Sequence, residues 1–320
     1  MDFQILKSNL TNPTLLFFVL GVLAVIIKSD LEIPASSSKF ISLYLLFSIG
    51  FKGGQELAHS GFTTEIIYSL LFGLAIASII PLYTFFILKR KMSISDAGAV
   101  AAAYGSVSAV TFIAAVSFLE AQKIIFGGHM VAVMAMMESP AIIMGVILLM
   151  KYDTGNRGEG KLTETIKHSF TSGSVLMILG SLIIGIIADT KQAEGIKPFT
   201  TDIFKGFLAI FLLEMGMVTA NRFSAFRKYG WFASAFAIII PMINGCIVAA
   251  VSGMVTNDVG NRFIFAVLAA SASYIAVPAA MRLAAPKADP GLYIPMALGI
   301  TFPFNITVGM PVYMLIVANT

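Results

Sequence analysis

Charged residues are scarce in this chain, because only 12% of its 320 residues are Asp, Glu, Lys or Arg, where a soluble domain carries about 25%. Hydrophobic residues make up 58% of it. No sizeable soluble domain fits such a composition. The net charge of +4 is scattered over short loops, a distribution that reflects membrane orientation and not the binding of nucleic acid.

Residues that form disulfides and metal sites are also rare. Cys246 is the single cysteine, so one chain holds neither a disulfide framework nor a cysteine metal cage. His59, His129 and His168 are isolated, and there is no His-Glu-x-x-His pair. The lysine loop of ATPases and the Gly-x-Ser-x-Gly elbow of hydrolases are missing too. The sequence therefore predicts no enzyme and no cofactor.

Apolar runs, by contrast, fill most of the chain. Runs long enough to cross ~30 Å of hydrocarbon at ~1.5 Å per residue recur about ten times. The sequence therefore predicts an all-α integral membrane protein with ten transmembrane helices. The expected spans are 14–28, 40–55, 65–89, 97–119, 128–150, 171–189, 204–220, 231–254, 262–283 and 291–318.

The polar, glycine-rich stretch 151–170 divides the chain into residues 1–150 and 171–320, with five expected spans each. If the N-terminus is outside, 14 of the 21 Lys and Arg residues fall on the opposite side. Because cytoplasmic loops are enriched in Lys and Arg, this count predicts that both termini are outside and that loop 151–170 is cytoplasmic. We expect the protein in the plasma (inner) membrane.

The two halves also resemble each other, which predicts a duplication. An odd number of spans in each unit makes the second copy inverted relative to the first. In an inverted repeat, equivalent interrupted helices cross near the bilayer midplane. The matching positions are Gly21 with Gly180, Gly50 with Gly216, and Pro140 with Pro303.

The fourth and ninth expected spans each contain an interruption rich in Ser. A helix in hydrocarbon can lose its regular hydrogen bonds only where protein or a wet cavity covers the backbone, so paired interruptions indicate a transport site. Half-helix N-termini at such a site favour an anion. Close packing of small residues between helices is the alternative. The candidate substrate-binding residues are Gly105, Ser106, Val107, Ser108, Ser271, Ser273, Tyr274 and Pro278.

Two of these residues have special roles in the prediction. Pro278 should remove one helical N–H and clash with the carbonyl of Tyr274, which would break the ninth span. The Tyr274 phenol could then bond a substrate oxygen or that freed carbonyl, although a membrane tyrosine can equally be a packing residue or an interfacial anchor.

Carboxylates inside apolar spans are costly and therefore informative. Glu138, which precedes Pro140, could hold a cation or carry a proton, or it could be a neutral structural group. Glu214 could have either a functional or a structural role. The candidate residues for cation coupling are Glu138, Thr111, Ser108 and Ser273. Sodium is a possible ion, and the sequence does not decide which residues would be its ligands.

At these residues the chain resembles the cyanobacterial sodium-dependent bicarbonate transporter family over nearly its whole length. The family's Gly-Ala-Val-Ser-Gly-Ser-Thr segment matches Gly105, Val107, Ser108 and Thr111, with Ala109 in place of its second Gly. Its Ser-Ser-Ser-Asp-Ile-Ser-Gly-Pro-Pro segment matches Ser271, Ser273, Ile275 and Pro278, but Tyr274 replaces the Asp. Its Asp-Ile-Pro is similar to 138–140, where Glu138 keeps the acid.

The resemblance implies a core domain that moves against a gate or scaffold domain in an elevator mechanism, in a homotrimer. It implies an anion site where the broken helices cross, and sodium coupling through an acid that is Tyr274 here. It also implies a PII-like cytoplasmic regulator, although loop 151–170 is shorter than the family's.

We expect a cation-coupled transporter of a small anion, bicarbonate by resemblance. Two alternatives stay open. In the first, Tyr274 and Val277 reshape the pocket for an organic carboxylate. In the second, the protein is a membrane sensor or scaffold that no longer transports.

Overall fold

The chain folds into helices throughout the part that the structure describes. The structure is a computed structural model and describes residues 13–60, 63–153, 167, 171, 173–223, 230–274 and 276–320, which contain no strand. Most of the 151–170 loop, including His168, lies outside these residues. The helices are α2 (Pro13–Ile26), α3 (Ala35–Ser60), α4 (Thr64–Leu88), α5 (Ile94–Gly105), α6 (Ala109–Ala121), α7 (His129–Tyr152), α9 (Gly173–Ile187), α10 (Thr190–Lys197), η1 (Pro198–Asp202), α11 (Phe204–Phe223), α12 (Gly230–Val251), η3 (Ser252–Met254), α13 (Val259–Ala269), α14 (Ala276–Ala284), α15 (Pro290–Met296), η4 (Ala297–Thr301), α16 (Phe302–Phe304), η5 (Asn305–Gly309) and α17 (Met310–Asn319).

Six helical stretches among the described residues are long and apolar enough to cross a membrane. The protein is therefore a multi-pass membrane protein. Four expected spans are not among the six, and the ten-span count stays a prediction. Helices α2 and α9 have only 14 and 15 residues, α3 carries several polar and charged side chains, and the ninth span is divided between α13 and α14. The six stretches are Thr64–Leu88, Ile94–Ala121, His129–Tyr152, Thr190–Asn221, Gly230–Met254 and Pro290–Asn319.

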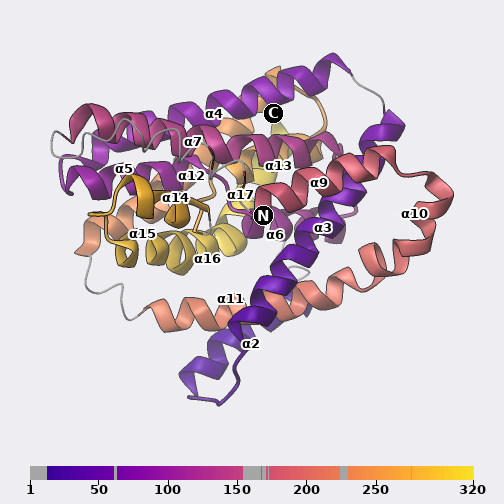
Figure 1. Cartoon of the computed structure of the whole chain (residues 1–320), viewed down its shortest axis with the longest axis horizontal. Coiled ribbons are helices and arrows are strands. Elements are labelled where there is room, and N and C mark those ends of the chain that lie inside the picture. Colours follow the sequence, from indigo (N-terminus) through magenta and orange to yellow (C-terminus); the bar gives the residue numbers. More distant parts are fainter. Residues whose placement is uncertain are drawn as a thin grey trace.

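The helices form two groups, as Figure 1 shows. In one group α2 packs on α11, and α3 packs on α9. In the other, α4 packs on α5 and α7, while α12 packs on α13 and α17. Under the predicted duplication, α9 and α11 would correspond to α2 and α3, and the α2–α11 contact would correspond to the α3–α9 contact. The duplication itself stays a prediction. Whether the second unit is inverted in the membrane stays a prediction.

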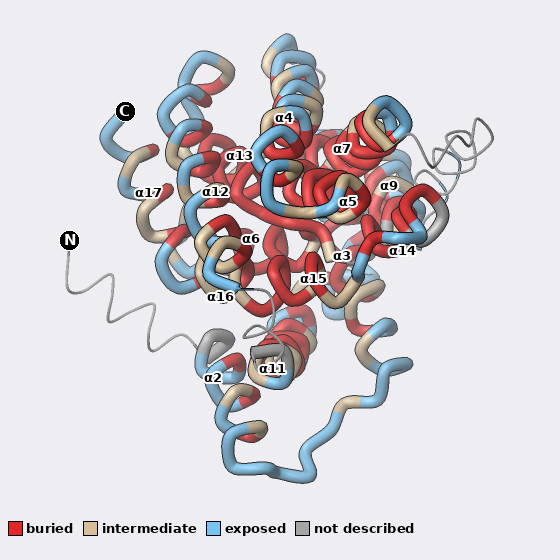
Figure 2. The backbone as a smooth tube through the Cα atoms, turned by 90° about the vertical axis from the view of Figure 1, so that its left-hand side faces the viewer, coloured by how far each residue is buried: buried red, intermediate tan, exposed pale blue. Residues whose placement is uncertain are grey.

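The interrupted helix α5–α6 lies at the centre of the molecule. In its apolar stretch of 18 residues, 94% of the residues are buried, whereas the share is 39% in the corresponding stretches of α4 and of the helix that contains α12. Figure 2 shows the same contrast, with buried residues in the middle and exposed ones on the outer helices. The exposed residues of α4 and α12 include large apolar side chains such as Ile67, Leu71, Ile243 and Ile247. Such apolar outer surfaces are suited to lipid contact.

Glycines let the helices of the first group approach backbone to backbone. A Cβ atom on Gly21 of α2 would lie 2.0 Å from the Leu213 carbonyl oxygen of α11. On Gly54 of α3 it would lie 2.1 Å from the Leu182 carbonyl oxygen of α9. Gly180, which matches Gly21 in the repeat, has no atom within 4 Å of such a Cβ. Small residues at membrane helix crossings permit this kind of contact.

This difference gives a matched pair of substitutions. We expect Gly21→Ala to destabilise the protein by about 1–3 kcal/mol, because the new methyl group forces α2 away from α11. Gly180→Ala should be neutral or stabilising, by up to ~1 kcal/mol, because alanine favours helix and the site is open. Thermal unfolding of the purified variants measures both. Equal melting temperatures for the two would show that the α2–α11 crossing does not require glycine.

Candidate functional site

The first interruption separates α5 from α6 at residues 106–108. Gly105 ends α5 against Pro81 of α4, whose Cγ would lie 2.1 Å from a Cβ on Gly105. Ser106 and Ser108 are extended, and Ser108 caps α6 by accepting the Thr111 N–H through its hydroxyl at 3.2 Å. The break therefore combines a close approach that only glycine permits with a serine that starts a new helix.

The second interruption follows α13, which ends at Ala269, and precedes α14, which begins at Ala276. The Asn305 side chain donates to the freed Ala270 carbonyl at 2.7 Å. The helix does not continue back from Pro278 to Tyr274, whose carbonyl the proline ring would meet in a continuous helix. Pro278 lies in the first turn of α14, where its missing N–H removes no intrahelical bond, and Tyr274 lies before that helix.

The two interruptions contact each other through backbone groups. The Ser108 N–H donates to Ser271 Oγ at 3.1 Å, and the Ser273 N–H donates to the Ala103 carbonyl at 2.8 Å. The Ser271 hydroxyl in turn donates to the Leu268 carbonyl at 2.8 Å. Each break thus supplies hydrogen-bond partners that the other has lost. The two stretches that the sequence marked are neighbours in space.

A cavity of about 30 Å³ lies beside this junction. One wall comes from the breaks and from α7, and the opposite wall comes from α3 and α11. The cavity therefore lies between the two helix groups. It is lined by Ser42, Leu46, Val107, Ser108, Ala109, Val110, Ile113, Glu138, Phe211, Ser273, Tyr274 and Ala276.

The predicted site residues divide into those that line the cavity and those that support it. Ser106 is buried, and its hydroxyl donates to the Glu138 carbonyl at 3.3 Å. Thr111 is also buried, one turn inside α6. Lining residues from the prediction are Val107, Ser108, Glu138, Ser273 and Tyr274, and those that do not line it are Gly105, Ser106, Thr111, Ser271 and Pro278.

Helix N-termini give the cavity a positive field. Ala109 and Val110, the first two residues of α6, line it, and Ala276, the first of α14, does so as well. The first N–H groups of a helix have no partner inside that helix, and the dipole places positive charge at this end. Two helices that begin at one cavity make it suitable for an anion.

Two carboxylates lie near this field. Glu138 is 9% exposed and lines the cavity. Glu214 of α11 is also 9% exposed but does not line it, and its Oε2 has no hydrogen-bond partner among the described residues. The next residue, Met215, accepts from the Tyr274 hydroxyl at 3.7 Å through its sulfur. Glu214 therefore lies next to the residue that the Tyr274 hydroxyl contacts, outside the cavity that Glu138 lines.

Several residues of the site were not predicted from the sequence. Ser42 and Phe211 line the cavity from the first helix group. Asn305 supports the second break, and its Oδ1 accepts from the Tyr313 hydroxyl at 3.1 Å. An amide in an apolar span is a signal that could have identified Asn305. The apolar lining residues carry no such signal.

The described residues contain no group of three or more His, Cys, Asp or Glu side chains that could hold a metal ion. A cation at this cavity would therefore depend on one carboxylate, hydroxyl groups and backbone carbonyls. Sodium accepts such oxygen ligands, as other hard cations do.

A family model described as the Na⁺-dependent bicarbonate transporter superfamily matches residues 13–318. The comparison with curated proteins gives no match.

The contact between the two breaks allows a prediction for the loss of the Ser271 hydroxyl. We expect Ser271→Ala to lower the free energy of unfolding by about 1–3 kcal/mol, because the buried Ser108 N–H loses its acceptor. The Leu268 carbonyl keeps the Ser271 backbone N–H, which donates to it at 3.1 Å. Ser271→Thr keeps a hydroxyl and should lose less. Thermal unfolding of the purified proteins measures the difference. Unchanged stability of Ser271→Ala would mean that the Ser108 N–H is satisfied elsewhere.

Proposed function

Because the chain belongs to the Na⁺-dependent bicarbonate transporter superfamily, we propose that it is a secondary active transporter of a small anion, with bicarbonate as the first candidate. The observation that carries this proposal is the cavity where two broken helices meet, with the N-termini of α6 and α14 at its wall. The anion would lie against the N–H groups of Ala109 and Val110, and the Ser108 and Ser273 hydroxyls would orient it.

The volume of the cavity favours a small ion over an organic acid. Sites for drug-sized ligands enclose about 300–1,000 Å³, whereas this cavity holds about 30 Å³. Leu46, Phe211 and Tyr274 fill the space that a larger carboxylate would need. Competition of bicarbonate uptake by carboxylic acids tests this choice, and strong inhibition by them would favour the organic carboxylate alternative.

Charge balance supports coupling to a cation. An anion and an ionised Glu138 in one small, buried cavity would repel each other strongly. A sodium ion or a proton bound with the anion removes that repulsion. Sodium would be cargo here, held by the Glu138 carboxylate and by the Ser108 and Ser273 hydroxyls. Thr111 does not line the cavity, so it would contribute through its backbone N–H, which donates to the Ser108 hydroxyl.

The arrangement of the helices supports an elevator movement. The substrate cavity lies between the two groups of helices, so a shift of one group along the other would carry it towards the opposite side of the membrane. The group of α4–α7 and α12–α17 would be the moving core, and α2, α3, α9 and α11 the scaffold. The inverted repeat, the homotrimer, the outside termini, the inner membrane and a PII-like regulator at loop 151–170 belong to the same proposal.

We expect Glu138→Gln to abolish most of the stimulation of bicarbonate uptake by its coupling cation, by about tenfold or more, since an amide cannot supply the charge. Purified protein in liposomes, given radiolabelled bicarbonate under imposed sodium or proton gradients, measures this and identifies the cation. Glu32→Gln, at an exposed position, is the control. Full stimulation in Glu138→Gln would exclude Glu138 as the coupling group.

Tyr274→Asp tests whether the missing acid limits sodium use. The substitution adds a second carboxylate to the cavity that Glu138 lines, and we expect the apparent affinity for sodium to rise about tenfold. Tyr274→Phe, which keeps the ring, should not gain sodium affinity. A silent parent together with an active Tyr274→Asp protein would favour the sensor or scaffold alternative over transport.

A further inference from the structure

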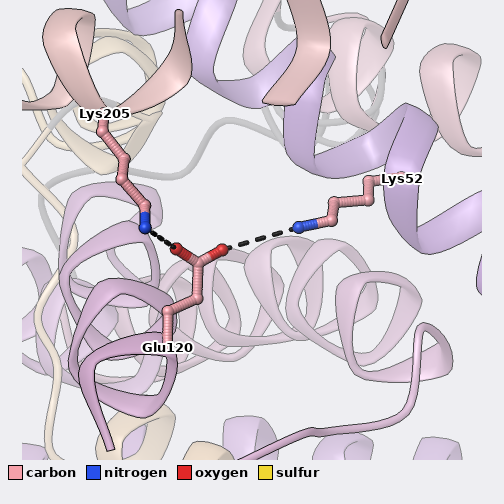
Figure 3. Close-up of polar contacts among 3 residues, drawn as sticks. All are labelled: Lys52, Glu120 and Lys205. Carbon is pink, nitrogen blue, oxygen red and sulfur yellow. Dashed lines mark hydrogen bonds and ion pairs between the residues drawn. The ribbon is translucent and has the colours of Figure 1, made fainter. Parts of the chain in front are cut away.

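A second cavity, of about 170 Å³, lies at the end of α6 that is farther from the breaks. Its polar residues are Lys52 of α3, Glu120 of α6, Lys205 of α11, and Ser48, Thr200 and Thr201. Figure 3 shows the Glu120 carboxylate between the two ammonium groups. Glu120 Oε1 is 3.5 Å from Lys52 Nζ, and Oε2 is 3.7 Å from Lys205 Nζ.

The lining of this cavity carries two ammonium groups and one carboxylate. Both ion pairs are long for charge-assisted contacts. Glu56, which does not line the cavity, also interacts electrostatically with Lys52 and Glu120. The side chains of Lys52 and Lys205 are 48% and 74% exposed, so a solute can reach them. The Ser48 hydroxyl, beside Tyr44, is 1% exposed and has no hydrogen bond of ordinary geometry among the described residues. A partly exposed cavity with two ammonium groups and a hydroxyl in its wall is suited to a small oxyanion.

The second cavity is aligned with the first along the same three helices. On α3, Leu46 lines the first cavity and Ile49 lines the second. On α6, Ile113 lines the first cavity and Val116 lines the second. Three residues of helix correspond to ~4.5 Å along its axis. Both cavities also share α11, through Phe211 and Lys205. Only an apolar layer about one helical turn thick separates them.

We propose that the cavity around Lys52, Glu120 and Lys205 is a separate binding site for a small inorganic oxyanion of the bicarbonate type. There the anion competes with Glu120 for the two ammonium groups. Its role as the entrance to the first cavity rests on the proposed transport function, whereas anion binding itself does not. Glu120 then acts as an internal competitor, so its removal should strengthen anion binding, while removal of either lysine should weaken it.

Protection by bicarbonate separates this site from a simple ion-pair tether. In either case Lys52→Gln lowers and Glu120→Gln raises the local positive charge, because one removes a positive charge and the other removes a negative charge. Only at an anion site should bicarbonate occupy the cavity, and its effect should then weaken in Lys52→Gln and strengthen in Glu120→Gln.

The test measures the local charge with thiol reagents on the full-length protein in detergent. A Thr201→Cys substitution in a Cys246→Ser background places one thiol at the cavity wall. Its rate of modification by a negatively charged methanethiosulfonate, relative to a positively charged one, should exceed that of a free thiol. At low ionic strength the ratio should fall about fivefold in Lys52→Gln or Lys205→Gln and rise about fivefold in Glu120→Gln. Lys287→Gln, at an exposed position between α14 and α15, is the control.

Bicarbonate should also slow the negatively charged reagent more than a zwitterionic buffer adjusted to the same ionic strength. The proposal is overturned if the ratio does not change, if the lysine and glutamate variants shift it in the same direction, or if bicarbonate gives no protection. Bicarbonate flux in liposomes separates the two proposals. Protection by bicarbonate without bicarbonate flux would support the anion site and overturn the transport proposal. Bicarbonate flux without a charge preference at the thiol would support transport and overturn the anion site.

Discussion

The low polarity of the membrane interior imposes the constraint on which the rest of this structure depends. A backbone group without a hydrogen bond in hydrocarbon costs several kcal/mol, yet both α5–α6 and α13–α14 lose helical bonds near their middle. The two breaks meet this constraint together, through the bonds from Ser108 to Ser271 and from Ser273 to Ala103. Either break alone would leave groups unsatisfied, so both must be present and in contact, and both must be shielded by the surrounding helices.

The candidate site follows from that contact. Once the breaks are joined, α6 and α14 both begin beside the same cavity, and their N-termini give it a positive field. Glu138 brings a negative group to the same wall, which makes a bound anion dependent on a cation or proton. The opposite wall comes from α3 and α11, which glycine contacts hold close to α9 and α2. The residues that would bind the anion therefore lie at the boundary between the two helix groups.

Much of this site could be predicted from local sequence, because its signals are local. Gly105, Ser108 and Ser271 mark the breaks since such residues are unusual in an apolar run, and Glu138 stands out for the same reason. Pro278 was expected to interrupt the span near Tyr274, but the sequence alone did not show that α14 would begin at Ala276 and place the proline in its first turn. Ser42 and Phe211 could not be predicted, since their position depends on packing between helices far apart in the chain.

The most direct test of the account is whether a bound anion touches the backbone at the start of α6. In solid-state NMR of the protein with ¹³C-bicarbonate, dipolar coupling between the bicarbonate carbon and ¹⁵N-labelled valine should be detectable, because Val107 and Val110 line the cavity. A sample labelled with ¹⁵N-leucine should show no coupling, because the lining leucine, Leu46, lies inside α3 and its N–H is bonded within that helix. Coupling to valine alone is the predicted result. Bound bicarbonate without coupling to valine would contradict the claim that the broken helices hold the anion.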